Sequence, residues 1–270
     1  MSKVYKHIFF LFALVGFLAI SLYTQYDDYR KKKLSGFSSD CEKMARLALD
    51  DFHKTYEGQD VIIIGDSRMA QWPSYIIQRH LPGLTFFNFA VSGDVSRQTL
   101  CRVQLVSKEL SKKAIILQVG INDLVAISML SNREKLERNQ LESATFKNIS
   151  LISEIFTPSN KVFVLSIVPP IDTDMIRALV WGGGIRESAQ AVSSRVGQLP
   201  SIEFVDVSHV FYDENKKNWR SEFSADALHW NHSAYESITQ LMYSTHLEHL
   251  IENTVEARLQ KRQGPIISCF

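Results

Sequence analysis

Cysteine is scarce in this chain, and its charges nearly cancel. Three cysteines, Cys41, Cys101 and Cys269, stand far apart in 270 residues. Their odd number and wide spacing argue against a disulfide framework, and no close pairs of cysteine or histidine suggest a zinc site. The formal net charge is +1, whereas proteins that hold nucleic acid by bulk electrostatics carry a clear positive excess. We therefore expect no nucleic-acid partner and no zinc site.

Charge is missing altogether from one N-terminal segment. No Asp, Glu, Lys or Arg lies between Lys6 and Asp27, and residues 7–26 are mostly apolar. A helix of about 20 residues is about 30 Å long, which matches the hydrocarbon core of a bilayer. The segment predicts an uncleaved transmembrane anchor. A cleaved signal peptide is the alternative, because Ala19 and Ser21 are small residues at a possible cleavage site.

The rest of the chain alternates between apolar runs and segments long enough for helices. The runs predict five strands, at residues 61–64, 84–90, 114–120, 161–168 and 202–207. The predicted helices lie near residues 74–80, 95–111, 134–156, 185–197 and 232–250. Short, continuously apolar strands alternating with helices are typical of an α/β fold whose parallel sheet is covered on both faces. We divide the chain into an anchor and linker (1–37), one globular domain (38–250) and a C-terminal tail (251–270).

Four polar stretches interrupt this pattern at positions where α/β proteins bind ligands. Three follow predicted strands and one precedes the last helix: GDSR (65–68), NFAVSGD (88–94), VGINDL (119–124) and DALHWN (226–231). Because the carboxyl ends of parallel strands share one edge of the sheet, we expect these stretches to meet there.

Together the four stretches contain the groups that acyl-ester cleavage needs. Ser67 is the candidate nucleophile, and a serine hydroxyl needs a base such as His229 to take its proton. Asp226, three residues earlier, could bind Nδ1 of that histidine and fix its tautomer. The Asn122 amide and the backbone N–H groups of Ser67 and Gly93 could stabilise an oxyanion.

This ordered set resembles the SGNH hydrolases, also called GDSL-type esterases, of a membrane-anchored bacterial type. The four blocks of that family supply serine, glycine, asparagine and histidine in the order found here, over about residues 60 to 245. The resemblance implies a flavodoxin-like three-layer α/β/α sandwich around a five-stranded parallel sheet. It also implies hydrolysis or transfer of acyl esters without a metal or other cofactor.

The sequence departs from the family beside the nucleophile and beside the histidine. Arg68 stands where many members have leucine, and Trp230 stands where proline is frequent. Together with Trp72 and Trp181, these side chains predict a substrate that is apolar on one face and polar on the other, such as a sugar. We expect short acyl groups on a cell-envelope carbohydrate, either a polysaccharide or a glycolipid.

Other activities fit the same residues. An O-acyltransferase would pass the acyl group to a sugar hydroxyl, and a lipase or lysophospholipase would accept longer chains. A non-catalytic binding module is a further alternative.

The location of the enzyme is predicted less directly. A basic cluster at residues 30–33 follows the anchor and, counted literally, would keep the domain in the cytoplasm, although long domains are translocated regardless of such charge. We predict a single-pass protein of the bacterial inner membrane, with its catalytic domain in the periplasm or outside the cell.

Overall fold

The structure is a computed structural model of the 270-residue chain. The contacts between residues divide the chain into two compact units, Met1–Ser39 and Asp40–Phe270. The residues that the structure describes are 3–38, 49, 52–110, 113–127, 135–170, 184–213, 220–226 and 228–247. The predicted tail at 251–270 lies outside these residues.

The N-terminal unit is one continuous helix, α1 (Lys3–Ser38). Its large apolar side chains are exposed, as in Phe12 at 73% and Ile20 at 66%. Among the described residues, no helix meets the combined length and hydropathy of a membrane span. The transmembrane anchor predicted over residues 7–26 is therefore not supported.

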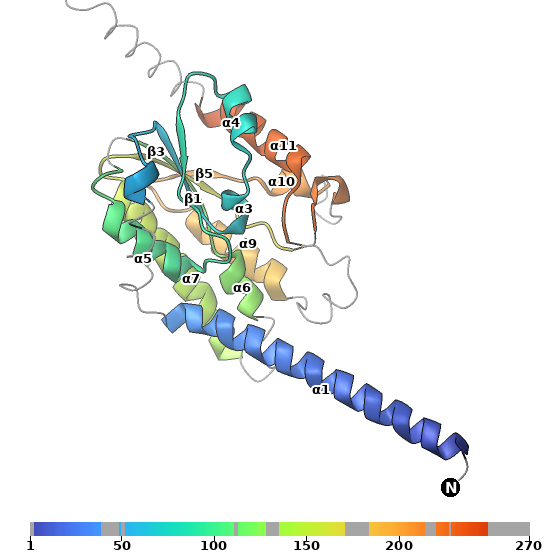
Figure 1. The fold of residues 1–270 in the computed structure, drawn as a ribbon. Helices are drawn as coiled ribbons and strands as arrows, with labels where there is room; N and C mark the ends of the chain where they lie inside the picture. Colours follow the sequence, from blue (N-terminus) through green and yellow to red (C-terminus); the bar gives the residue numbers. More distant parts are fainter. Residues whose placement is uncertain are drawn as a thin grey trace, which may run out of the picture. The chain divides into compact units, whose positions relative to one another are not determined.

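The second unit is built on a five-stranded sheet in which all neighbouring strands are parallel (Figure 1). The strand order is β2-β1-β3-β4-β5, which is the flavodoxin-like order. The strands are β1 (Val61–Gly65), β2 (Phe86–Asn88), β3 (Ala114–Gln118), β4 (Lys161–Leu165) and β5 (Glu203–Val205). They confirm the predicted α/β class and parallel sheet.

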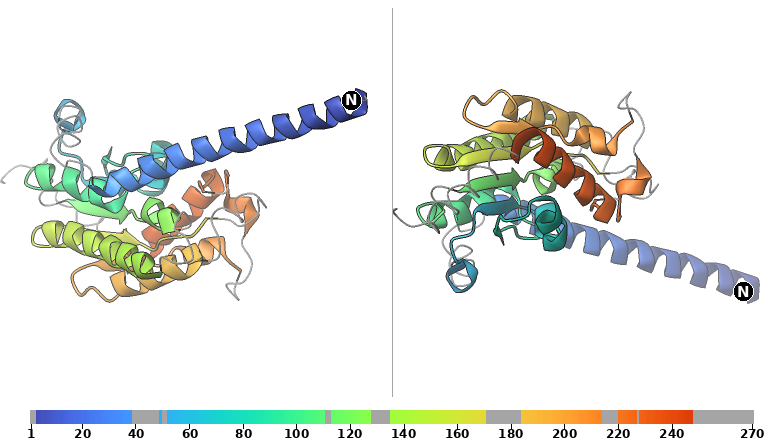
Figure 2. Two further views of the ribbon diagram at one scale, coloured as in Figure 1. Left: turned by 90° about the horizontal axis from the view of Figure 1, so that it is seen from below. Right: turned by 90° about the horizontal axis from the view of Figure 1, so that it is seen from above.

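Helices cover both faces of this sheet (Figures 1 and 2). One layer contains α5 (Ser96–Val106), α7 (Lys135–Phe156) and α9 (Gly184–Val196), and the other contains α4 (Ser74–His80) and α11 (His232–Met242). Shorter elements lie after strands or near the end: α3 (Ser67–Ala70), α6 (Ile121–Ile127), α10 (Ser208–Phe211), a 3₁₀ turn (Ser221–Phe223) and a π-helical turn (Tyr243–Leu247).

The side chains of β1 show why the sheet needs both layers. Ile63 joins the apolar cluster that includes Ile76 of α4 and Ile238 of α11. Ile62 and Ile64 alternate with it and are also fully buried. Burying one such side chain contributes about 1.5–3 kcal/mol, so a strand that is apolar throughout is stable only between two helical layers.

Cys101 on α5 takes part in a disulfide bond that the sequence did not predict. It is 2% exposed, as expected of a small apolar residue, but it is disulfide-bonded. An odd number of widely spaced cysteines excludes a framework of several bridges, yet it does not exclude one pair.

Candidate active site

The first strand ends in a turn that only glycine can make. A Cβ on Gly65 would lie 2.0 Å from the backbone oxygen of Gln118 in the neighbouring strand, which is far inside contact distance. Asp66 then caps α3, because its side chain accepts a hydrogen bond from Arg68 N at 3.1 Å. Ser67 is consequently the first residue of a short helix at the carboxyl edge of the sheet, and 5% of it is exposed.

The structure brings Ser67, His229 and Asp226 together. His229 Nε2 lies 3.0 Å from Ser67 Oγ, and His229 Nδ1 lies 2.8 Å from Asp226 Oδ2. A carboxylate can only accept, so Nδ1 carries the proton that it donates to Asp226, and Nε2 is left to accept from the serine hydroxyl. This is the tautomer that a general base next to serine requires.

Asp226 is held as a carboxylate by its own loop. Its Oδ1 accepts hydrogen bonds from the backbone N–H groups of Leu228 at 2.7 Å and His229 at 2.8 Å. Partial burial raises the pKa of Asp226, but the hydrogen bonds from His229 and Leu228 outweigh it and lower that pKa to about 2. The group therefore stays ionised at any pH at which a histidine can act as a base.

The loop that carries Gly93 is tied to the nucleophile turn and to Asn122. Val91 N donates to Gly65 O at 3.0 Å, and Asn122 Nδ2 donates to Asp94 O at 2.9 Å. Gly93 has φ +85°, in the left-handed region that favours glycine. The structure therefore joins the second and third sequence blocks to each other and to the turn that holds Ser67.

Sequence comparison identifies the group of proteins to which this arrangement corresponds. The sequence model of the GDSL-like Lipase/Acylhydrolase family matches residues 43–236. The chain belongs to this family. It is an ester-hydrolysing enzyme, as the sequence predicted. No curated protein sequence is similar enough to match it.

Solved structures share the fold of this GDSL-like hydrolase. A GDSL-like lipase from Bacteroides thetaiotaomicron is 18% identical, with a TM-score of 0.59 over 79% of this chain and 99% of that chain. A member of the lipolytic G-D-S-L family from Veillonella parvula is 16% identical, with a TM-score of 0.51 over 69% of this chain and 97% of that one. A lipase from a goat rumen metagenome is 19% identical, with a TM-score of 0.50 over 68% and 95%. At these identities the likeness concerns the fold.

Arg68, which the sequence placed against the substrate, is instead completely buried. Its exposed fraction is 0%, and its guanidinium donates to Leu228 O from Nε at 2.9 Å and to Val168 O from Nη1. Burial lowers the pKa of Arg68 to about 10, so the group remains a cation at neutral pH. The prediction that Arg68 contacts the substrate was wrong, because its guanidinium points into the core, where two backbone carbonyls accept its hydrogen bonds.

Trp72 and Trp230 do not form a sugar platform either. Trp72 is 5% exposed and donates from Nε1 to Thr239 Oγ1 at 3.1 Å. Trp230 is 3% exposed and packs on Phe211, with ring centroids 5.0 Å apart. Both belong to the apolar cluster under α4 and α11, while Trp181 lies outside the described residues. In the sequence Trp72 and Trp230 lie close to Ser67 and His229, but the sequence could not show that their rings face the core.

Two buried ionic groups next to the site were not predicted. Arg102 on α5 donates from Nη2 to Asp94 Oδ2 at 2.5 Å and from Nη1 to Phe89 O at 2.7 Å, which fixes both ends of the Gly93 loop. Asp123, next to Asn122, accepts from Ser96 N at 2.8 Å and from Ser96 Oγ at 2.6 Å. Burial raises the pKa of Asp123 to about 7, although the Ser96 hydrogen bonds act in the opposite direction.

No signal in a single sequence separates these groups from ordinary surface charges. Among the described residues, no group of three or more His, Cys, Asp or Glu side chains is arranged to hold a metal ion.

Proposed function

We propose that this enzyme is a serine esterase in which Ser67 is the nucleophile, His229 the general base and Asp226 the residue that orients it. One observation carries the proposal. The hydrogen-bonded chain from Ser67 Oγ through the imidazole to the Asp226 carboxylate, with distances of 3.0 and 2.8 Å, lies at the carboxyl edge of the sheet.

The proposed reaction has two stages. Ser67 Oγ attacks the ester carbonyl carbon while its proton passes to His229 Nε2, and the carbonyl oxygen becomes an oxyanion. The intermediate collapses, the C–O bond to the alcohol breaks, and the imidazolium returns the proton to that alcohol. Water then attacks the acyl-serine with His229 again as base, which releases the acid and restores Ser67.

The oxyanion hole would be formed by the N–H groups of Ser67 and Gly93 and by the Asn122 amide. The hydrogen bond from Asn122 Nδ2 to Asp94 O, at 2.9 Å, holds the Asn122 amide beside the Gly93 loop. Fixed donors of this kind act mainly on the transition state, because the negative charge exists only there.

We retain short acyl esters of a cell-envelope carbohydrate as the proposed substrate class. Trp72 and Trp230 no longer support it, because both are buried. Chain-length profiling tests the acyl part: the rate should be highest on acetyl or propionyl esters. A maximum at eight carbons or more would instead assign the enzyme to the lipase or lysophospholipase class.

We also propose that the domain works outside the cytoplasm and that α1 attaches it to a membrane. Two observations support this location. The disulfide at Cys101 is of a kind that persists in oxidising compartments, and the exposed apolar side chains of α1 need an apolar environment. A C-terminal alkaline phosphatase fusion should be active in intact bacteria, and the protein should sediment with membranes. Bright fluorescence from a C-terminal fluorescent-protein fusion in the cytoplasm would refute export.

A serine-directed phosphonate tests the catalytic assignment. The wild-type protein should be labelled and inactivated, whereas Ser67→Ala should resist labelling and lose at least about 10³-fold in kcat. Ser159→Ala is the matched control, because this exposed serine precedes β4 at the opposite edge of the sheet. Equal labelling of wild type and Ser67→Ala would refute the proposal.

A further inference from the structure

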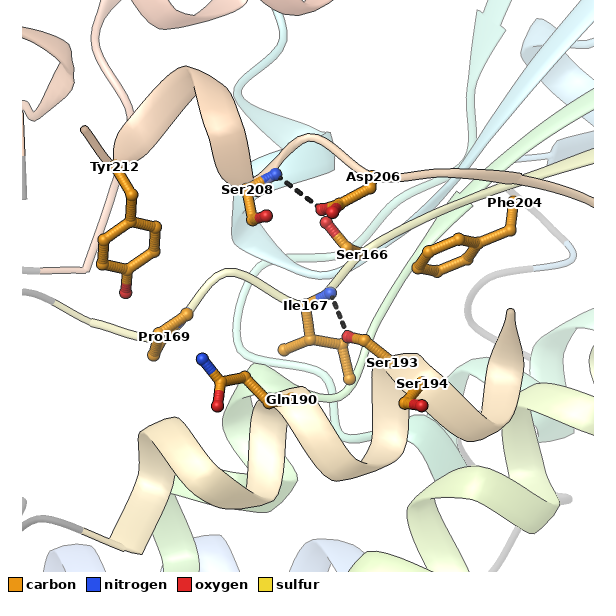
Figure 3. A pocket seen from close by; sticks show the side chains of 10 residues that line it. All are labelled: Ser166, Ile167, Pro169, Gln190, Ser193, Ser194, Phe204, Asp206, Ser208 and Tyr212. Carbon is orange, nitrogen blue, oxygen red and sulfur yellow. Dashed lines mark hydrogen bonds between the residues drawn. The ribbon is translucent and has the colours of Figure 1, made fainter. Parts of the chain in front are cut away.

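A pocket lies beyond the carboxyl ends of β4 and β5 (Figure 3). Its volume is about 260 Å³, close to the lower end of small-ligand sites. The residues that line it are Ser166, Ile167, Pro169, Gln190, Ser193, Ser194, Phe204, Asp206, Ser208 and Tyr212.

The floor of this pocket forms where the pairing of β4 and β5 ends. Beyond the last paired residues, two backbone N–H groups are taken up by serine side chains. Ile167 N donates to Ser193 Oγ at 2.9 Å and Val207 N donates to Ser166 Oγ at 3.0 Å. Both serines are nearly buried, at 9% and 3% exposure. Each hydroxyl oxygen is therefore fixed in position, and its own hydrogen can turn to an acceptor.

The walls combine neutral polar groups and the Asp206 carboxylate with apolar surface. Gln190 extends from α9 toward the centre of the pocket, and Phe204 presents its ring from β5 (Figure 3). Asp206 is held by Ser208 N, which donates to Oδ1 at 2.9 Å. The described lining contains no lysine, arginine or histidine. With one carboxylate and several hydroxyl and amide groups beside apolar surface, the lining favours a ligand that has many hydroxyl groups, an apolar face and no negative charge, and it disfavours phosphate or a long alkyl chain.

The pocket is too far from the nucleophile for one small ester to occupy both sites. β4 is two strands from β1 and β5 is three strands away, which at about 4.8 Å per strand is about 10–14 Å. We propose that the pocket binds an uncharged sugar unit that neighbours the ester-bearing unit of an oligosaccharide. This inference rests on the proposed esterase function and adds a second binding site to it.

Three kinds of substrate distinguish the proposed esterase function from the proposed sugar pocket. They are 4-nitrophenyl acetate, which has no sugar, acetylated monosaccharides, and acetylated cello-, xylo- and chito-tetrasaccharides. The variants are Gln190→Leu and Ser208→Val, with Gln198→Leu as the matched control, because Gln198 is exposed just beyond α9 and outside the pocket. Binding of the same tetrasaccharides without acetyl groups is measured by saturation-transfer NMR on Ser67→Ala.

We expect at least one tetrasaccharide ester to exceed its monosaccharide in kcat/KM. Gln190→Leu and Ser208→Val should each reduce that advantage about 3- to 10-fold, the effect of one neutral hydrogen bond, and should weaken the NMR signal. The rate on 4-nitrophenyl acetate and the behaviour of Gln198→Leu should not change.

Other results discriminate between the proposals. Hydrolysis of 4-nitrophenyl acetate with no tetrasaccharide advantage in the panel would overturn the sugar pocket and leave the esterase intact. If no ester is hydrolysed, the esterase proposal fails, and the NMR comparison of Gln190→Leu with Gln198→Leu decides the pocket on its own. Equal tetrasaccharide binding by these two variants would overturn it.

Discussion

Replacing Arg68 with methionine should damage catalysis more than it damages the fold. The guanidinium connects Val168, just beyond β4, to Leu228, the residue before His229. It also lies 5.2 Å from the centre of the Trp230 ring. Without the guanidinium, the carbonyl of Leu228 loses this hydrogen bond, and the histidine loop can move relative to Ser67. Arg68 is thus a positioning residue that acts through His229.

Two opposing contributions of Arg68 to the free energy of unfolding partly cancel. Two hydrogen bonds from a charged donor are worth about 3–6 kcal/mol together, but removing a buried cation relieves a desolvation penalty of several kcal/mol. We expect the free energy of unfolding to fall by about 1–3 kcal/mol, the cost of carbonyls left unpaired. A displacement of about 1 Å at the base can cost up to about 10²-fold in rate, so kcat should fall about 10- to 100-fold while KM changes little.

The assay compares kcat, KM and urea unfolding for three variants. Arg68→Met should show the loss in kcat, and Arg68→Lys should recover part of it, because an ammonium keeps the charge but lacks the planar fork. Ile152→Ala is the stability control, since Ile152 is fully buried on α7 and its truncation costs about 2–5 kcal/mol. The reasoning fails if Arg68→Met keeps wild-type kcat, or if Ile152→Ala loses as much kcat as Arg68→Met does.

Four further predictions follow from the site. Asn122→Ala should lower kcat about 10²- to 10³-fold with little effect on KM; an effect confined to KM would mean that Asn122 only binds the ground state. Asp226→Asn should lower kcat about 10⁴-fold because Nδ1 loses its acceptor, and normal activity in this variant would remove Asp226 from the mechanism. Arg102→Met should lower kcat by releasing the Gly93 loop, with Arg97→Met, exposed on the same helix, as an inert control; equal effects would contradict it. Burial raises the pKa of Asp123 from 3.8 to about 7, so the folded state binds the extra proton and the free energy of unfolding should fall as pH rises from about 4 to 7, by at most about 4 kcal/mol. Urea unfolding at several pH values should show this slope in wild type and not in Asp123→Asn, and identical slopes would refute it.

The sheet was predictable because each strand repeats one simple signal. Residues 61–64 and 114–118 are apolar throughout, and such strands require cover on both faces. The edge strands were predicted too long: residues 84–90 gave only Phe86–Asn88, and residues 202–207 gave only Glu203–Val205. Beyond β2, Phe89 N and Val91 N still donate to Ile63 O and Gly65 O of β1, although the regular strand has ended. Where a strand ends therefore depends on two neighbouring segments, and the apolar pattern of one segment does not encode it.

At the active site, the sequence predicted which residues lie near one another better than it predicted where their side chains point. Ser67, His229 and Asp226 come together because their blocks follow or adjoin strand ends on one edge. Arg68 and Trp230 lie beside that same edge but point into the core. A short polar side chain at the carboxyl edge of the sheet keeps its polar atoms near that edge. A long side chain can instead turn into the core, so the spacing of residues in the sequence does not show where its polar group lies.

The link between Ser67 and His229 joins positions 162 residues apart, and from this separation we expect the active site to form late in folding. The nucleophile turn needs β1 beside β3, and His229 is brought to it only when α11 docks on α4. Closing so long a loop costs chain entropy that is recovered only by that final contact. Recovery of esterase activity during refolding should therefore lag behind recovery of helix and strand signals, and a fragment that ends before residue 220 should retain no turnover.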